Sequence, residues 1–187
     1  MDKIAIVLPS KRSVVFLKSY LSKRIEKPIF LPDFFSIEEF IESLSGLKVI
    51  DNLSLQFYLY QTYLKFPSSK IDSFDDFLAW SEILLHDFNE VDKDMVNAKA
   101  IFANLKNVKD LENWNLEDWS LSSDTLTISQ QDFIHFYDNI YNWYLDFNKN
   151  LRENKLSYQG MAYKEVANEI MNKQIPWKKI WFVGLNA

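Results

Sequence analysis

Residues 3–21 read KIAIVLPSKRSVVFLKSYL, and this stretch decides the fold class. An apolar run over residues 4–8 ends in the polar turn PSKR, and a helix-period pattern follows at once. A short apolar run that passes through a tight turn into a helix is typical of a parallel strand and its crossover helix. The sequence therefore predicts a strand at 4–8 and a helix over 11–26, with Ser10 as its N-cap and Pro28 beyond its end.

The turn between this strand and helix stands where a nucleotide-binding protein carries its phosphate loop. The start of a helix offers free backbone N–H groups, and Lys11 and Arg12 add positive charge there. The glycines of a G-x-x-x-x-G-K-[ST] loop, which let the backbone curl around phosphates, are missing. The turn is either a degenerate phosphate site or a plain strand–helix joint whose cations line a solvated helix face, the simpler interpretation. The candidate phosphate- or DNA-binding residues are Ser10, Lys11, Arg12 and Ser13.

Two more strands are expected in the same sheet. A second strand is predicted at 28–31, before a helix that begins with the capping box Ser36–Glu39 and ends near Gly46. The apolar run at 179–183 resembles the first strand. Because parallel strands buried on both faces need crossover helices, we expect the three strands to form one parallel sheet.

Residues 52–155 have a mainly helical pattern, interrupted by a less periodic polar stretch at 106–127 that is the best loop candidate. Ser73 is predicted to cap a helix, with Asp76 at the third position, and Asp92 to start the next. The small residues of that next helix, Val96, Ala100 and Ala103, are expected to permit close helix contact. A long aromatic helix is predicted over 129–154, much of it buried, and Ser157 is expected to cap a helix over 158–172.

The order of these elements gives the fold class and the division of the chain. We predict a predominantly helical α/β protein with a small parallel, P-loop-like sheet and a large inserted all-α subdomain. Residues 1–51 form the first part of the α/β domain, residues 52–155 the insertion, and residues 156–187 the return helix and strand. A three-stranded parallel sheet lacks cover after its last strand, so we expect the chain to be the N-terminal part of a longer protein.

Composition restricts the function only broadly. The chain has 187 residues, 48% of them hydrophobic, a formal net charge of -5 and no cysteine. This excludes disulfides and cysteine-based zinc sites, fits a cytoplasmic protein, and gives no global electrostatic reason to expect nucleic acid. The N-terminal apolar run is too short for a signal peptide or a membrane span, so no membrane association is expected.

Catalytic candidates are few. His86 and His135 are each expected to be partly buried packing residues of amphipathic helices rather than bases or ligands. Trp114 and Trp119, in the polar stretch 106–127, are more typical of loop packing than of base stacking. The acidic cluster Asp87, Glu90, Asp92 and Asp94 is interpreted as helix-end chemistry and not as a metal site, and no metal or cofactor is predicted.

Nuclease and ATPase motifs are both incomplete. The one acidic-x-lysine triplet, Glu153-Asn154-Lys155, falls at a predicted helix end, without the strand that a nuclease site uses. ATP hydrolysis also takes a magnesium-binding acid after a neighbouring strand, and Gly184, Leu185 and Asn186 stand in that place. We expect no intact nucleotide-hydrolysis site in this chain.

Several short blocks resemble the N-terminal region of AddB-like proteins of the PD-(D/E)XK nuclease family, of the Bacteroidetes type. In that family an often inactivated superfamily 1 helicase-like domain precedes a nuclease domain, and the whole acts in recombinational repair of double-strand breaks. The resemblance implies a sheet similar to that of a helicase 1A domain, with residues 52–155 as its inserted helical subdomain. It also implies that Ser10–Ser13 correspond to a degenerate ATP motif, that Gly184–Asn186 correspond to a degenerate second helicase motif, and that the nuclease domain lies beyond Ala187. The blocks are residues 8–13, 36–40, 73–80, 87–92 and 182–187.

The expected function is therefore non-catalytic. The leading interpretation is a helicase-like region that binds or positions DNA for a helicase–nuclease, with single-stranded DNA, a duplex end or a partner helicase–nuclease subunit as its partner. The alternative is a helical protein-binding module without DNA binding, in which the aromatic helix at 129–154 carries the interface. A third class, an unusual nucleotide-binding enzyme, stays open to a direct ATP-binding test.

Overall fold

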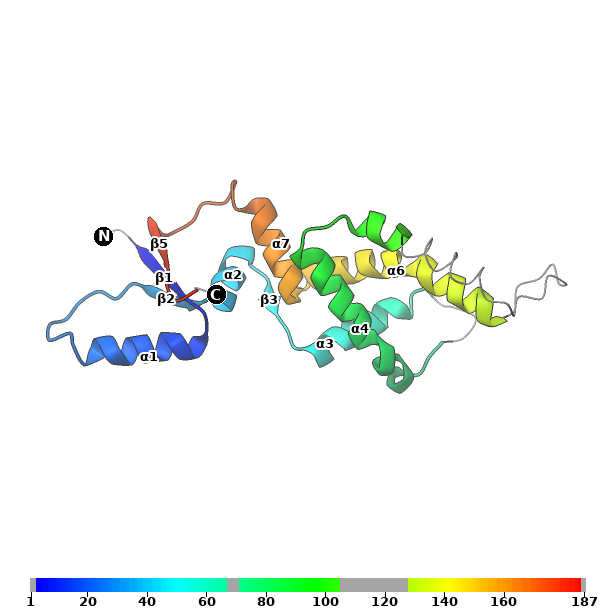
Figure 1. The fold of residues 1–187 in the computed structure, drawn as a ribbon, viewed down its shortest axis with the longest axis horizontal. Coiled ribbons are helices and arrows are strands. Elements are labelled where there is room, and N and C mark those ends of the chain that lie inside the picture. The colour runs from blue at the N-terminus through cyan, green and yellow to red at the C-terminus, as the bar shows by residue number, and fades with distance from the viewer. Residues whose placement is uncertain (1–2, 67–70, 105–127, 186–187) are drawn as a thin grey trace. The chain divides into compact units, whose positions relative to one another are not determined.

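The computed structural model describes residues 3–66, 71–104 and 128–185 (Figure 1). The chain packs into two compact units, which we call the sheet unit and the helical unit. The sheet unit comprises Met1–Leu47 and Glu165–Ala187, and the helical unit comprises Lys48–Lys164. The fold is α/β and predominantly helical, with a small parallel sheet, as the sequence predicts.

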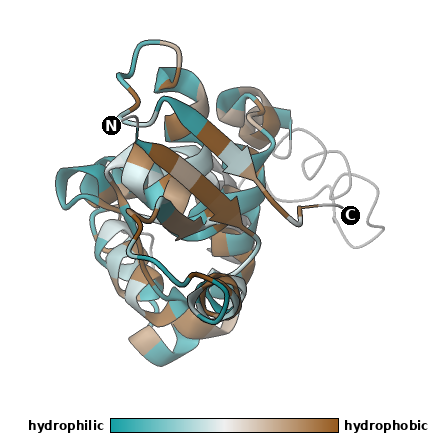
Figure 2. Ribbon diagram, turned by 90° about the vertical axis from the view of Figure 1, so that its left-hand side faces the viewer, coloured by the Kyte–Doolittle hydropathy of each residue, from teal (hydrophilic) through white to brown (hydrophobic). Residues whose placement is uncertain are grey.

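Three parallel strands form the sheet of the first unit. The central strand β1 (Ile4–Leu8) pairs with β2 (Asp33–Ser36) on one side and with β5 (Lys179–Phe182) on the other. Figure 2 shows β1 as an almost uninterrupted hydrophobic arrow beside β5. The prediction that the first and last apolar runs share one parallel sheet is confirmed.

The second strand lies later in the chain than the sequence indicated. Residues 28–31 are outside any strand, and Phe30 is 85% exposed. In the observed register, Leu8 pairs with Ser36, so β2 runs directly into the helix that Ser36 caps. The predicted position was wrong because β2 forms where the chain comes into register with β1. In that register Ala5 to Leu8 pair with residues 33–36, not with residues 28–31.

Two helices follow the first two strands. Helix α1 (Lys11–Ser22) begins at the predicted N-cap Ser10 but ends earlier than expected, because the polar residues after Leu21 have no apolar surface to cover. Helix α2 (Ile37–Ser45) has the predicted capping box and ends at Gly46, whose φ of 72° is the left-handed conformation that glycine adopts most readily.

The core of the sheet unit is small. Val7, Phe40 and Leu44 form a buried cluster, and Trp177 packs against Phe40 with ring centroids 5.7 Å apart. The same unit also buries Ala5, Leu8, Val14 and Leu47. The indole N–H of Trp177 donates to Asp33 over 2.7 Å. The remaining contacts to this core are made by partly buried side chains from β2, α2, the end of the return helix and β5: Phe35, Ile37, Val166, Ile170 and Ile180.

The helical unit contains four long helices and one short one among its described residues. They are α3 (Asn52–Tyr63), α4 (Phe74–Lys93), a short helix over 98–104, α6 (Ile128–Glu153) and α7 (Gln159–Glu169), whose last turn belongs to the sheet unit. Two short strands, β3 (Lys48–Val49) and β4 (Leu156–Ser157), pair in parallel. Both strands lie just outside the predicted insertion, residues 52–155, whose described elements are all helices.

Two expected helix starts in this unit were wrong. Asp92 lies inside α4, which continues to Lys93, because the apolar stripe of that helix extends through Val91. The following helix begins only at Ala98. Ala98 and Phe102 are buried, Ala100 and Ala103 are exposed, and Val96 is exposed before the helix starts. Ser157 belongs to β4, and its buried hydroxyl has no hydrogen-bond partner among the described residues, so it caps no helix.

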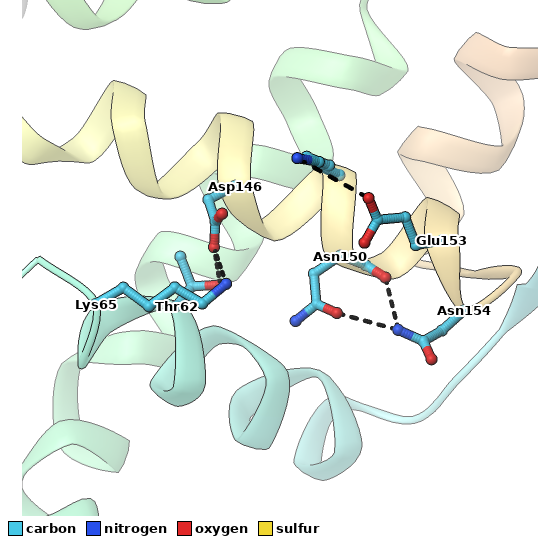
Figure 3. A network of polar contacts seen from close by, with 7 residues as sticks. Thr62, Lys65, Asp146, Asn150, Glu153 and Asn154 are labelled. Carbon is cyan, nitrogen blue, oxygen red and sulfur yellow. Dashed lines mark hydrogen bonds and ion pairs between the residues drawn. The ribbon is translucent and has the colours of Figure 1, made fainter.

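The core of the helical unit is aromatic. Phe77, Phe88 and Phe147 are fully buried, and Trp143 is 2% exposed. Polar contacts join α3 and the turn after it to α6: Lys65 donates to Asp146 over 2.7 Å, and the buried Thr62 donates to the same carboxylate over 3.3 Å (Figure 3). The described aromatic residues of α6 thus serve mainly to hold this unit together.

Candidate nucleic-acid interface on the first helix

The predicted site lies at the carboxyl edge of the sheet. Gly184 follows β5, and a Cβ atom built on it would lie 3.8 Å from the ring of Pro9, the residue that follows β1. The Val183 N–H donates to the Val7 carbonyl over 2.9 Å, which holds the two segments together. Open parallel sheets bind ligands at this edge, where crossovers on opposite faces diverge. The two candidate motifs therefore meet here through Pro9 and Gly184, while Asn186 lies outside the described residues.

Hydrogen bonds within the turn already occupy some of the polar groups that could bind a phosphate. The Ser10 hydroxyl accepts from the Ser13 N–H over 3.2 Å, and the Ser10 carbonyl accepts from the Val14 N–H. The first N–H groups of a helix have no intrahelical acceptor. The N–H groups of Lys11 and Arg12 are therefore available at the helix start to donate to an anion. The geometry provides a two-amide anion contact rather than a cradle.

A carboxylate lies beside this turn. The ammonium of Lys11 is 3.6 Å from Glu39, which closes the capping box of α2. The backbone hydrogen bond from Ser36 is the main cause that lowers the pKa of Glu39, and Lys11 lowers it further. Glu39 therefore stays ionised and reduces the positive charge available from Lys11.

The outer face of α1 carries a regular set of exposed side chains. Residues four apart on a helix lie on one row. Two neighbouring rows of α1 each begin with a cation, and a second cation follows each row in the turn just beyond Ser22. The first row has two aromatic rings at its centre, and the second has an aliphatic side chain and a serine. We call this surface the α1 outer face: Arg12, Phe16, Tyr20 and Arg24 in the first row, and Lys11, Val15, Ser19 and Lys23 in the second.

Most cations of the α1 outer face have no acidic partner. Residues 11–25 contain no aspartate or glutamate. Among the described residues, no carboxylate pairs with Arg12, Lys23 or Arg24. The guanidinium of Arg24 lies 4.5 Å from the ring centroid of Tyr20, a cation–π contact that leaves its charge uncompensated. This surface is therefore a patch of positive charge on an acidic protein.

A second feature of the sheet unit is an apolar pocket on one face of the sheet. Its volume is about 410 Å³, and Ile4, Ile6, Phe30, Leu31 and Trp181 supply most of its apolar lining. Trp181 is 56% exposed. Apolar side chains left open to water in this way are a common mark of an interaction surface.

The most elaborate polar cluster belongs to the helical unit and was missed in the sequence. Asp92 is 1% exposed, and its carboxylate accepts hydrogen bonds from the hydroxyls of Tyr144 and Tyr158 and from Lys164 over 2.7 Å. Burial, reinforced by Asp92, raises the pKa values of both tyrosines well above their ordinary range. The one sequence signal that could have placed Asp92 in the core is the apolar stripe of α4, which continues beyond Phe88 to Val91.

The Asp92 cluster has a structural role. Its acid is saturated by three donors, and its tyrosines are held protonated, so it offers neither a base nor an open ligand position. A pocket of about 400 Å³ lies nearby and is lined in part by His86 and Glu90. His86 is exposed, which corrects its predicted burial. No group of three or more potential metal ligands occurs among the residues described.

Other sequence candidates are not brought together. The triplet at 153–155 ends α6 and turns through Lys155, whose φ is 56°, so no strand supports it. Trp114 and Trp119 lie outside the described residues, as does the side chain of His135. No helix in the described ranges is long and apolar enough to cross a bilayer.

The fold and the site together define a helical α/β protein with a small parallel sheet and a basic, aromatic first helix. Comparison with known proteins identifies no relative: no protein-family model, no curated protein and no solved structure matches the chain.

Proposed function

We propose that this chain is a non-catalytic nucleic-acid-binding module that contacts DNA phosphates through the α1 outer face. The observation that carries this proposal is the set of cations at the start of α1 and in the turn just after it, on a segment without acidic residues. Phosphate contacts by lysine and arginine supply most of the sequence-independent affinity for DNA. The two amides at the start of α1 add a further phosphate contact.

Binding without ATP hydrolysis agrees with the geometry of the turn. Ser10 caps the helix with its own hydroxyl, Lys11 lies beside Glu39, and Gly184 follows β5 in place of an acid. The resemblance to the AddB-like family supports the same proposal, in which the chain positions DNA beside a partner helicase–nuclease subunit during double-strand break repair. We propose that the protein performs this function in the cytoplasm.

The proposal is tested by measuring DNA affinity as a function of salt. We expect the wild-type chain to bind a labelled oligonucleotide at low salt, and the variant Arg12→Gln/Lys23→Gln to bind at least about tenfold more weakly. The slope of log K against log [salt] should fall by about 1.4, because each lost single-strand phosphate contact contributes about 0.7.

A matched control removes the same charge elsewhere. Lys93→Gln/Lys149→Gln changes two exposed cations of the helical unit, each of which pairs with a glutamate of its own helix. This variant should bind DNA like the wild type. Equal losses in the two double variants would reduce the effect to net charge and overturn the assignment of the site.

A protein partner is the alternative function, and the apolar pocket favours it. The interface predicted on the aromatic helix is less suitable, because Ile140, Trp143 and Phe147 of α6 are buried within the helical unit. Phe30 and Trp181 of the sheet unit are exposed instead. The protein-binding function replaces the one proposed if two results are found together. The wild-type chain does not bind DNA at low salt, and it captures a partner protein that the Trp181→Ser variant does not capture.

A further inference from the structure

We infer that the α1 outer face selects single-stranded nucleic acid by stacking bases on Phe16 and Tyr20. This inference rests on the proposed function and extends it from phosphate binding to the form of the ligand. Surfaces that bind single strands without sequence preference combine cations that follow the backbone with aromatic rings on which bases stack. The α1 outer face has both components in one regular pattern.

The exposure of the two rings is the first observation. Phe16 is 69% exposed and Tyr20 is 52% exposed, although the buried side of the same helix has room only for Val14 and the partly buried Leu17 and Leu21. Among the described residues, no other ring packs on Phe16. Two neighbouring aromatic rings left in water on a folded helix form a ready surface for a flat apolar ligand.

The spacing of the rings is the second observation. Phe16 and Tyr20 are four residues apart on one row, which separates them by about 6 Å along the helix axis. Arg12 continues this row at the start of the helix, and Arg24, in the turn after the helix, lies against Tyr20 at the other end. A single strand laid along α1 therefore meets a cation, two stacking platforms and a second cation in turn, with Lys11 and Lys23 of the neighbouring row beside its phosphates.

The guanidinium of Arg24 supports stacking from one side. It lies 4.5 Å from the Tyr20 ring centroid and so covers part of that ring, while a base stacks on the remaining exposed surface or on the guanidinium plane itself. In a duplex the base faces are already stacked on one another, so the rings gain nothing there. The discrimination between single strand and duplex comes from Phe16 and Tyr20, and the phosphate affinity from the cations.

The test compares one oligonucleotide as a single strand and as a duplex. The wild-type chain should prefer the single strand, and Phe16→Ala/Tyr20→Ala should lose about tenfold or more in single-strand affinity, with duplex affinity and the salt slope unchanged. Phe16→Trp should retain the preference, because an indole also stacks. Ile83→Ala, which truncates a similarly exposed apolar side chain on α4 of the helical unit, is the matched control and should leave both affinities unchanged.

The outcomes separate the two proposals. If the wild type binds neither form of DNA at low salt, the proposed function itself fails. If the wild type binds DNA but Phe16→Ala/Tyr20→Ala keeps the same preference, phosphate binding stands and the stacking inference is overturned. Binding to anionic phosphatidylserine vesicles that depends on Phe16, with DNA ignored, would assign the α1 outer face to a membrane surface and overturn both.

Discussion

The two units differ in where they place key charged and aromatic side chains: the helical unit buries them with partners, and the first helix of the sheet unit exposes them to solvent. In the helical unit the carboxylate of Asp92 is buried with three donors, and rings such as Phe88 and Phe147 are fully enclosed. In the sheet unit Arg12 and Lys23 have no acidic partner among the described residues, and Phe16 stands in solvent. Polar groups satisfied inside the fold stabilise it, while unsatisfied charge and open rings remain available to a partner.

Removing the buried acid should have the largest effect. Asp92→Ala leaves the ammonium of Lys164 and two buried hydroxyls without their acceptor, so we expect the free energy of unfolding to fall by about 3–5 kcal/mol in chemical denaturation. Asp94→Ala, two residues later and exposed, should change it by less than about 0.5 kcal/mol. Equal effects of the two changes would contradict the structural role of Asp92.

A substitution where α7 packs closely against α4 should destabilise the protein almost as much as the loss of Asp92. The Gly160 N–H donates to the Asn89 side chain over 2.8 Å, and a Cβ atom on Gly160 would lie 2.2 Å from the Asn89 carbonyl oxygen. Gly160→Ala forces backbone to move and should destabilise the helical unit by about 2–3 kcal/mol in thermal or chemical unfolding. A variant as stable as the wild type would show that the two helices do not pack this closely.

Alkaline pH should destabilise the helical unit through its buried tyrosines. The pKa values of Tyr144 and Tyr158 are raised by burial, so the folded state retains protons that the unfolded chain releases above about pH 10. Their contribution to stability is present below that pH and is lost as pH rises further, by about 1.4 kcal/mol per pH unit for each tyrosine. Tyr158→Phe should reduce this slope by about half; an unchanged slope would exclude Tyr158 as a source.

The smallest effect on stability is expected on the α1 outer face. Phe16 contributes little to the core of the sheet unit, so Phe16→Ala should change the free energy of unfolding by less than about 0.5 kcal/mol. The same change should weaken single-strand binding about tenfold. A large loss of stability, measured by chemical denaturation, would mean that the ring is part of the fold and is not available to a ligand.

Local patterns predicted more of this fold than long-range contacts did. Strand β1, the capping box at Ser36 and the left-handed Gly46 follow from residues adjacent in sequence. The position of β2 was missed because register with β1, and not the apolar run at 28–31, decides where the strand forms. An apolar run without a neighbouring strand to pair with has no ladder to join.

The candidate site shows the same limit. Lys11 and Arg12 were found from the turn they occupy, whereas the pairing of Lys11 with Glu39 depends on the meeting of two strand ends. The partners of Asp92 lie 52, 66 and 72 positions away, beyond the reach of any periodicity. The exposure of Phe16 was also unreadable, because two apolar stripes on one short helix do not reveal which of them is buried.

Lysine footprinting tests the central contrast most directly. Acetylation of each lysine is measured by mass spectrometry with and without a single-stranded oligonucleotide at low salt. We expect protection of Lys11 and Lys23 in the sheet unit and unchanged reactivity of Lys93 and Lys149 in the helical unit. Protection confined to the helical-unit lysines, or no protection at any lysine, would contradict the assignment of nucleic-acid binding to the α1 outer face.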